Sequence, residues 1–120
     1  MQLRKFYENS GVDYNALIRR LAGNEALLYK YLKSFVEDKN YTELCKAVMS
    51  KDYDTVLKTA HSIKGMSINL GLEKLFEISS AIVISVREEH FDKVEPFWEQ
   101  LKSEYARVIS QIGMLEYAGA

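Results

Sequence analysis

The residues best suited to chemistry are a histidine, a lysine and a glycine within one short run of the chain. Lys64 and Gly65 follow His61 at three and four positions. Residues three and four apart share a face of a helix, so this spacing would bring both next to the imidazole. Neutral imidazole is a nucleophile near pH 7, because its unperturbed pKa is about 6.5, and an ammonium one turn away can balance the charge of an attached phosphoryl group. The run therefore predicts a histidine that carries a charged group.

Gly65 would supply room rather than chemistry. A glycine inside a helix costs about 1 kcal/mol relative to alanine, so its presence one turn from His61 suggests that a partner protein approaches closely there. Taken alone, these residues leave another interpretation open, in which His61 is an ordinary surface histidine on the flank of a helix.

The run resembles the signature of histidine phosphotransfer (HPt) domains. In that signature the phosphorylated histidine is followed by a small polar residue, an aliphatic residue, a lysine and a glycine, with a second glycine ten positions after the histidine. These positions are filled here by Ser62, Ile63, Lys64, Gly65 and Gly71. The resemblance extends over about residues 11–113, the expected core of one domain that spans 1–120.

The resemblance implies that His61 receives a phosphoryl group from the aspartate of a response-regulator receiver domain, or from a sensor histidine kinase that can be of the hybrid type, and passes it to another receiver. The Mg²⁺ for the transfer would come from the receiver, so the chain needs no cofactor of its own. Lys64 and, from the following helix, Arg87 would lie beside the phosphoryl group. Arg87 also fits the simpler role of a cation favoured by a helix C-terminus. Val83 departs from the family pattern, which often has a polar residue there to hold the imidazole.

The receiver is expected to dock around His61, mainly on the second to fourth helices, which follow the short first helix and begin near residues 24, 52 and 72. The residues expected to contact it are Leu57, Lys58, Ser62, Gly65 and Ile68. Met66 stands where a small residue is usual, and we expect it either to contact the partner or to fill space as a flexible packing residue.

The spacing of apolar residues predicts helices over most of the chain. They are expected over 13–21, 24–50 with a kink or brief break near Lys39, 52–70, 72–87 and from the turn at 91–92 to 113. Asp13, Asn24 and Asp52 are the expected N-caps. Four long helices with short connections predict an all-α, up-down-up-down four-helix bundle with one additional short N-terminal helix across its end.

The same patterns predict which side chains are buried. Tyr31 belongs to the apolar stripe of the second helix, and Phe97 and Tyr105 to that of the last. His61 falls on the flank of its stripe and should be partly exposed. The tail from Met114 onward should be frayed.

Composition excludes several classes of protein. The chain has 120 residues, of which 48% are hydrophobic and 28% charged, and a net charge of −1. Interspersed charges argue against a nucleic-acid partner. Cys45 is the single cysteine, which fits a reducing compartment. The most apolar stretch, 78–86, is too short to span a bilayer. We therefore expect a cytoplasmic monomer that does not insert into membranes.

Other chemistries find little support. Only His61 and His90 are available as imidazole ligands, so no metal site is expected. No glycine-rich phosphate-binding loop is present, and the chain should not phosphorylate itself or act as an enzyme with its own kinase site. The remaining alternative is a helical adaptor that binds receiver domains through the same face without phosphotransfer.

Overall fold

The computed structural model describes residues 1–116 and is all-helical over that range. Its elements are α1 (Leu3–Glu8), α2 (Tyr14–Arg19), α3 (Glu25–Glu37), α4 (Asn40–Ser50), α5 (Tyr53–Asn69), α6 (Glu73–Arg87), the short 3₁₀ helix η1 (Phe91–Lys93) and α7 (Val94–Gly113). The predicted all-α class is confirmed.

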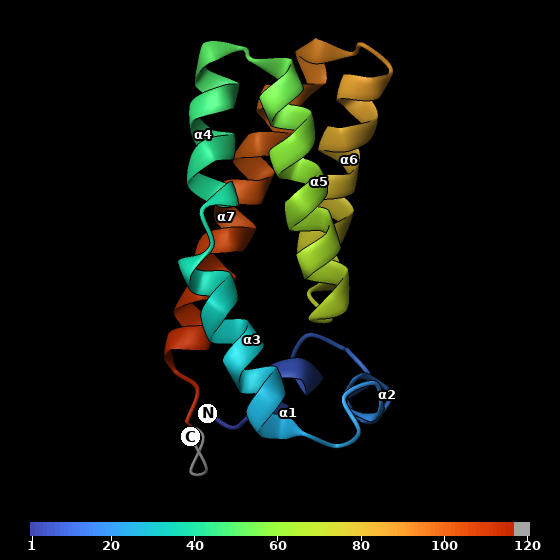
Figure 1. Ribbon diagram of the computed structural model, residues 1–120, viewed down its shortest axis with the longest axis vertical. Helices are drawn as coiled ribbons and strands as arrows, with labels where there is room; N and C mark the ends of the chain where they lie inside the picture. The colour runs from blue at the N-terminus through green and yellow to red at the C-terminus, as the bar shows by residue number, and fades with distance from the viewer. Residues whose placement is uncertain (117–120) are drawn as a thin grey trace.

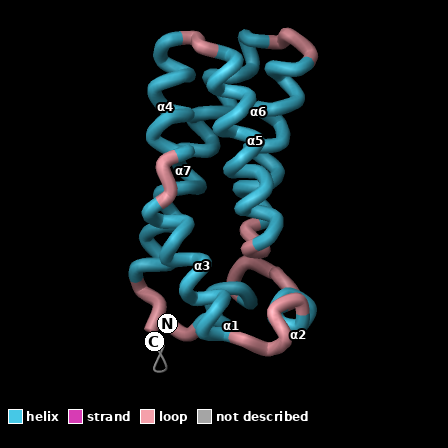
Figure 2. Tube along the Cα trace, viewed as in Figure 1, coloured by secondary structure: helices cyan, strands magenta, loops and turns pink. Residues whose placement is uncertain are grey.

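The long helices form an elongated bundle of 44 × 22 × 21 Å. Helices α3 and α4 follow one another along one arm, and α5, α6 and α7 form the other three, so the chain runs up, down, up and down (Figure 1). The loops gather at the two ends and at the break between α3 and α4 (Figure 2). This is the predicted architecture.

Two short helices, rather than the one predicted, lie across the end of the bundle that carries the N-terminus. The missed helix is α1, which buries Leu3, Phe6 and Tyr7. With only six residues, it shows less than two turns of apolar periodicity, which is too little to distinguish it from a loop.

The predicted N-caps form as expected. The side chains of Asp13, Asn24 and Asp52 each accept a hydrogen bond from the backbone N–H three residues later, at 3.1, 3.0 and 3.3 Å. The hydroxyl of Thr55 also donates to the Asp52 carboxylate at 2.6 Å. These hydrogen bonds from Thr55 hold the pKa of Asp52 below its usual value, because they favour the ionised carboxylate. Helix α5 therefore has a well-anchored start.

The kink or brief break predicted near Lys39 is confirmed as a break at residues 38–39, between α3 and α4. The carboxylate of Asp38 accepts hydrogen bonds from the backbone and side-chain amides of Asn40, both at 2.8 Å. Asp38 thus supports the turn that starts α4 and separates it from α3.

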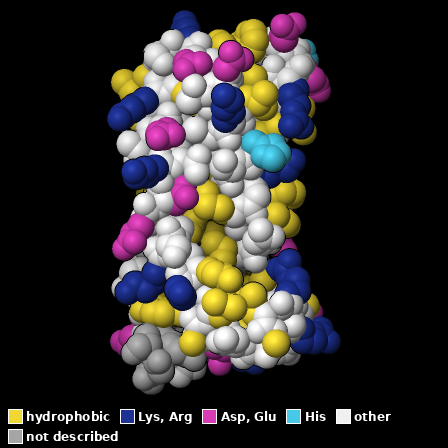
Figure 3. Space-filling model, viewed as in Figure 1, with side chains coloured by type: hydrophobic (Ala, Val, Ile, Leu, Met, Phe, Trp, Pro, Cys, Tyr) yellow, Lys and Arg dark blue, Asp and Glu magenta, His cyan; other side chains and the backbone are white. Residues whose placement is uncertain are grey.

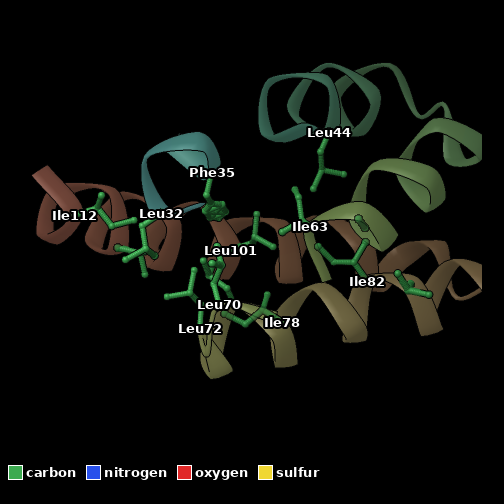
Figure 4. Close-up of a cluster of buried hydrophobic side chains, with 14 of the residues drawn as sticks. Leu32, Phe35, Leu44, Ile63, Leu70, Leu72, Ile78, Ile82, Leu101 and Ile112 are labelled. Carbon is green, nitrogen blue, oxygen red and sulfur yellow. The ribbon is translucent and has the colours of Figure 1, made fainter. Parts of the chain in front are cut away.

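Buried aliphatic side chains from all four arms meet along the bundle axis (Figure 4). Ile63 of α5 and Ile82 of α6 point into this core and are 1% and 0% exposed. Helices α5 and α6 contact each other more extensively than any other pair of helices in the described chain. The packing of their inward faces therefore determines the position of one helix relative to the other.

One of the predicted core positions needs correction. Tyr31 is exposed rather than buried, because it lies at the edge of the α3 stripe of Leu28, Leu32 and Phe35. In α7, Phe97 and Tyr105 are half-buried and pack against the core, and Trp98, which the predicted stripe left out, is buried as well.

The predicted fraying of the tail is wrong for residues 114–116. Leu115 is buried, and the backbone N–H of Glu116 donates to the Met1 carbonyl at 2.9 Å. The N-terminal ammonium donates to the Met114 carbonyl at 2.9 Å. Residues 117–120 lie outside the described part of the chain. Among residues 1–116, none of the helices is both long and apolar enough to cross a membrane.

Candidate functional site

Helix α5 holds the predicted nucleophile on its outward face. Its inward face is formed by Val56, Ala60 and Ile63, which are at most 1% exposed. His61 lies two residues before Ile63, and two residues correspond to a rotation of about 200° around a helix, so its side chain points away from the core. The imidazole is exposed. An incoming reactant can therefore reach it directly.

The other predicted site residues of α5 all lie at the surface. Lys58, Ser62 and Ile68 are exposed, whereas Leu57, Lys64 and Gly65 are half-buried. Helical spacing brings Leu57, Lys58, Lys64 and Gly65 within one turn of His61. Ser62 and Ile68 lie further from the imidazole, at the edges of this surface.

Gly65 has no neighbour that requires a glycine. A Cβ atom built at this position would meet no heavy atom within 4 Å, and its backbone is ordinary helix. The interior of the protein therefore gives no reason for the stability that the missing side chain costs. This supports the prediction that an external partner uses the space.

The cations around His61 are not neutralised within the described chain. Lys58, Lys64 and Arg87 form no ion pair with any residue that the structure describes. The Lys64 ammonium lies 5.9 Å from the centre of the Phe76 ring on α6, near the outer limit of a cation–π contact. Such a weak contact leaves Lys64 available to a phosphoryl group.

The Lys64–Phe76 contact also fixes which part of α6 lies beside His61. Lys64 on α5 lies level with Phe76 on α6. His61 lies three residues before Lys64, and the two helices run antiparallel, so the part of α6 level with His61 lies three or four residues after Phe76, close to residue 80. Arg87, the exposed last residue of α6, lies about 10 Å further along the axis, so only an extended side chain would approach His61. The role of Arg87 beside the histidine stays a prediction.

A groove lies between α2, α3 and the end of α5, in the part of the molecule where hydrophobic side chains gather at the surface (Figure 3). It has a volume of about 540 Å³ and a mostly apolar lining. Its walls are formed by Leu17, Arg20, Leu21, Tyr31, Ser34, Phe35, Asp38, Met66, Asn69 and Leu70. Met66 follows Gly65 directly, so the groove begins next to the surface around His61.

Sequence reasoning missed the α2 and α3 walls of this groove. Tyr31, assigned to the core, is 45% exposed and lines the groove instead. The position of Tyr31 at the edge of the apolar stripe of α3 could have indicated that its ring is partly exposed. The sequence did not show that α2 packs near α3 and so forms the other wall of the groove. Elsewhere among residues 1–116, no cluster of three or more potential metal-ligating His, Cys, Asp or Glu side chains is present.

Comparison with known proteins gives one informative match. Phosphorelay intermediate protein rdeA of Dictyostelium discoideum is 25% identical over 107 residues, which cover 88% of this chain and 40% of that protein. The match supports the resemblance to histidine phosphotransfer domains. The chain corresponds to less than half of that relative's length. No family model matches the chain, and no solved structure gives a significant match. An HPt domain needs a histidine that a receiver can reach, and His61 meets that requirement.

Proposed function

We propose that the protein is a phosphorelay intermediate in which His61 accepts a phosphoryl group from a receiver-domain aspartate and passes it to another receiver. The observation that carries the proposal is the exposed imidazole beside a helical glycine with no internal packing role. The relative's description as a phosphorelay intermediate supports the same role.

The transfer needs one nucleophilic atom on this chain. The lone pair of the His61 Nε2 atom forms the N–P bond, the P–O bond to the donor aspartate breaks, and its electron pair leaves on the carboxylate. The Nδ1 atom keeps its proton, so the phosphorylated ring is positively charged. In the onward step a second aspartate oxygen binds phosphorus, the N–P bond breaks, and the neutral imidazole is restored.

The surrounding cations complement the other half of the site. Receiver domains would contribute the acidic residues and the Mg²⁺, while Lys58, Lys64 and Arg87 present positive charge that no carboxylate among residues 1–116 pairs with. Phosphoryl transfer depends mainly on in-line positioning and charge stabilisation, so a rigid helix with one imidazole suffices on this side. No cofactor of its own is required.

Docking would extend from this surface into the groove. The outward face of α5, including Leu57, Lys58, Ser62, Gly65 and Ile68, lies next to the groove of about 540 Å³ between α2 and α3. The receiver would place its acidic pocket over His61 and an apolar part of its surface against Tyr31 and Met66. A sensor histidine kinase, free or hybrid, would charge the donor receiver, and the carrier would act as a cytoplasmic monomer.

Replacement of His61 by glutamine tests the proposal. The protein is incubated with phosphorylated receiver domains and Mg²⁺, and its intact mass is measured at neutral and acidic pH. We expect an acid-labile gain of one phosphoryl group in the natural protein and none in His61→Gln, with receiver binding largely retained. His90→Gln, which changes an exposed histidine in the connection between α6 and η1, should label normally.

A natural protein that binds phosphorylated receivers without gaining mass would contradict the relay. That result would favour the second candidate, an adaptor that binds receivers through the same surface. The adaptor also predicts that His61→Gln leaves every function unchanged.

A further inference from the structure

Helix α6 carries a buried hydroxyl that has no hydrogen-bond partner among residues 1–116. Ser79 and Ser85 donate hydrogen bonds to backbone carbonyls one turn earlier, at 2.6 and 2.8 Å. The Ser80 hydroxyl is also buried, yet it has no hydrogen-bond partner among the described residues. A buried hydroxyl without a partner costs free energy, so Ser80 is a candidate for a bond formed with a mobile group nearby.

The register of the two helices brings Ser80 level with His61. Lys64 and Phe76 contact each other across the two helices. His61 lies one turn before Lys64 along α5, and Ser80 lies one turn after Phe76 along α6. Both steps move in the same direction because the helices are antiparallel.

The two side chains also lie on the same side of the helix pair. Ile63 and Ile82 point into the core (Figure 4). His61 and Ser80 each precede one of these isoleucines by two residues, which rotates both by about 200° to the outer side. Because the Lys64–Phe76 contact joins the same two helices one turn away, His61 and Ser80 lie on adjoining parts of this outer side.

We propose that Ser80 is the positioning residue for His61, its hydroxyl oxygen accepting a hydrogen bond from the Nδ1–H group of the imidazole. This inference rests on the proposed function. The hydroxyl proton would be donated to the Phe76 carbonyl, as Ser79 donates to Leu75. Val83, which takes the position where a polar residue is common in the domains the chain resembles, is fully buried and cannot serve.

The bond would set which nitrogen reacts. A proton held on Nδ1 leaves the lone pair on Nε2, the nitrogen farther from the backbone, facing the approaching phosphoryl group. When the ring becomes positively charged after transfer, its Nδ1–H becomes a stronger donor, so the Ser80 oxygen stabilises the product more than the reactant. Ser80 thus acts through His61 and touches no phosphoryl atom.

The test measures the tautomer of His61 directly. The ¹⁵N chemical shifts of the imidazole are recorded near pH 8 for the natural protein, Ser80→Ala, Ser80→Thr and the matched control Ser79→Ala. We expect the Nδ1–H form to predominate in the natural protein, Ser80→Thr and Ser79→Ala. Ser80→Ala should revert to the Nε2–H form that free histidine favours, and its phosphotransfer should be about fivefold slower with unchanged receiver binding.

Two results would overturn the assignment. One is a natural protein with mainly the Nε2–H form, and the other is a tautomer ratio that Ser80→Ala does not change. Because the tautomer is read without any receiver, failure of this inference is separable from failure of the relay, in which His61 would never be phosphorylated.

Discussion

The surface around His61 and the neighbouring groove are built in different ways. The first consists mainly of residues of one helix, spaced so that Lys58, Lys64 and Gly65 all lie one turn from the imidazole. The second is assembled from α2, α3 and the end of α5, and no single segment supplies its shape. A surface on one helix depends on local spacing, whereas a groove between helices depends on packing across the fold.

This difference separates two tasks in the proposed relay. The α5 surface would carry out the chemistry, and the groove would contribute to recognition of the receiver. Variants that affect one task and spare the other therefore test the division.

The largest effect is expected from a large side chain at Gly65. Gly65→Arg should slow transfer from a receiver more than tenfold, because the side chain would occupy the space of the partner while leaving His61 in place. Stopped-flow transfer measurements check this, with labelling by the small donor phosphoramidate as a measure of intrinsic reactivity. Gly113→Arg is the control, since Gly113 is the last residue of α7, outside the surface around His61, and a Cβ atom there would likewise meet no heavy atom within 4 Å. Equal rates for Gly65→Arg and the natural protein would show that no partner approaches there.

A second prediction concerns the fold beneath the groove. Gly71 has φ of +68°, and a Cβ atom there would lie 3.1 Å from a Leu17 methyl carbon and 3.3 Å from the Tyr7 ring. Gly71→Ala should lower the free energy of unfolding by about 1–3 kcal/mol, as measured by urea denaturation. Because Leu17 lines the groove, receiver binding should weaken as well. Unchanged stability would contradict the described position of α2 against α5.

Removal of a groove side chain should affect recognition alone. Tyr31→Ala is expected to weaken receiver binding about fivefold, the loss of about 1 kcal/mol of apolar contact, without changing labelling by phosphoramidate. Calorimetric titration with a receiver measures the affinity. Met49→Ala serves as the control, because Met49 is 78% exposed on α4 and does not line the groove. If Tyr31→Ala and Met49→Ala bind equally well, the groove has no part in docking.

The smallest effect is expected at Lys64. Lys64→Ala should slow transfer about threefold, since one partly solvated cation near a phosphoryl group contributes on the order of 0.5–1 kcal/mol. Raising the salt concentration should reduce the difference between the variant and the natural protein. An unchanged rate at low salt would assign Lys64 to its contact with Phe76 alone.

Most of the fold was predictable from local signals. The caps at Asp13, Asn24 and Asp52 and the break after α3 follow from residue type and periodicity, which act within a few residues. Helix α1 was missed because its six residues give too short a period. Trp98 was left out of the predicted stripe because it lies 100° around the helix from Phe97, and packing against distant segments decides how wide the buried face is. These details depend on contacts with distant segments.

The candidate site divides in the same way. The exposure of His61 could be predicted from the stripe of α5, and so could the cluster of lysines and glycine around it. The groove wall at Tyr31 and the position of Ser80 beside α5 could not, because both depend on how two helices are aligned. The roles of Lys64, Arg87 and the predicted docking residues remain predictions for the experiments above.

The position of His61 within α5 has a consequence for its motion. It is the ninth of the helix's seventeen residues, with eight on either side. Helices fray from their ends, so the backbone at His61 should have the slowest amide hydrogen exchange along α5. The nucleophile therefore loses almost no backbone entropy when a receiver arrives, and the ordering cost of the encounter falls on side chains and on the partner.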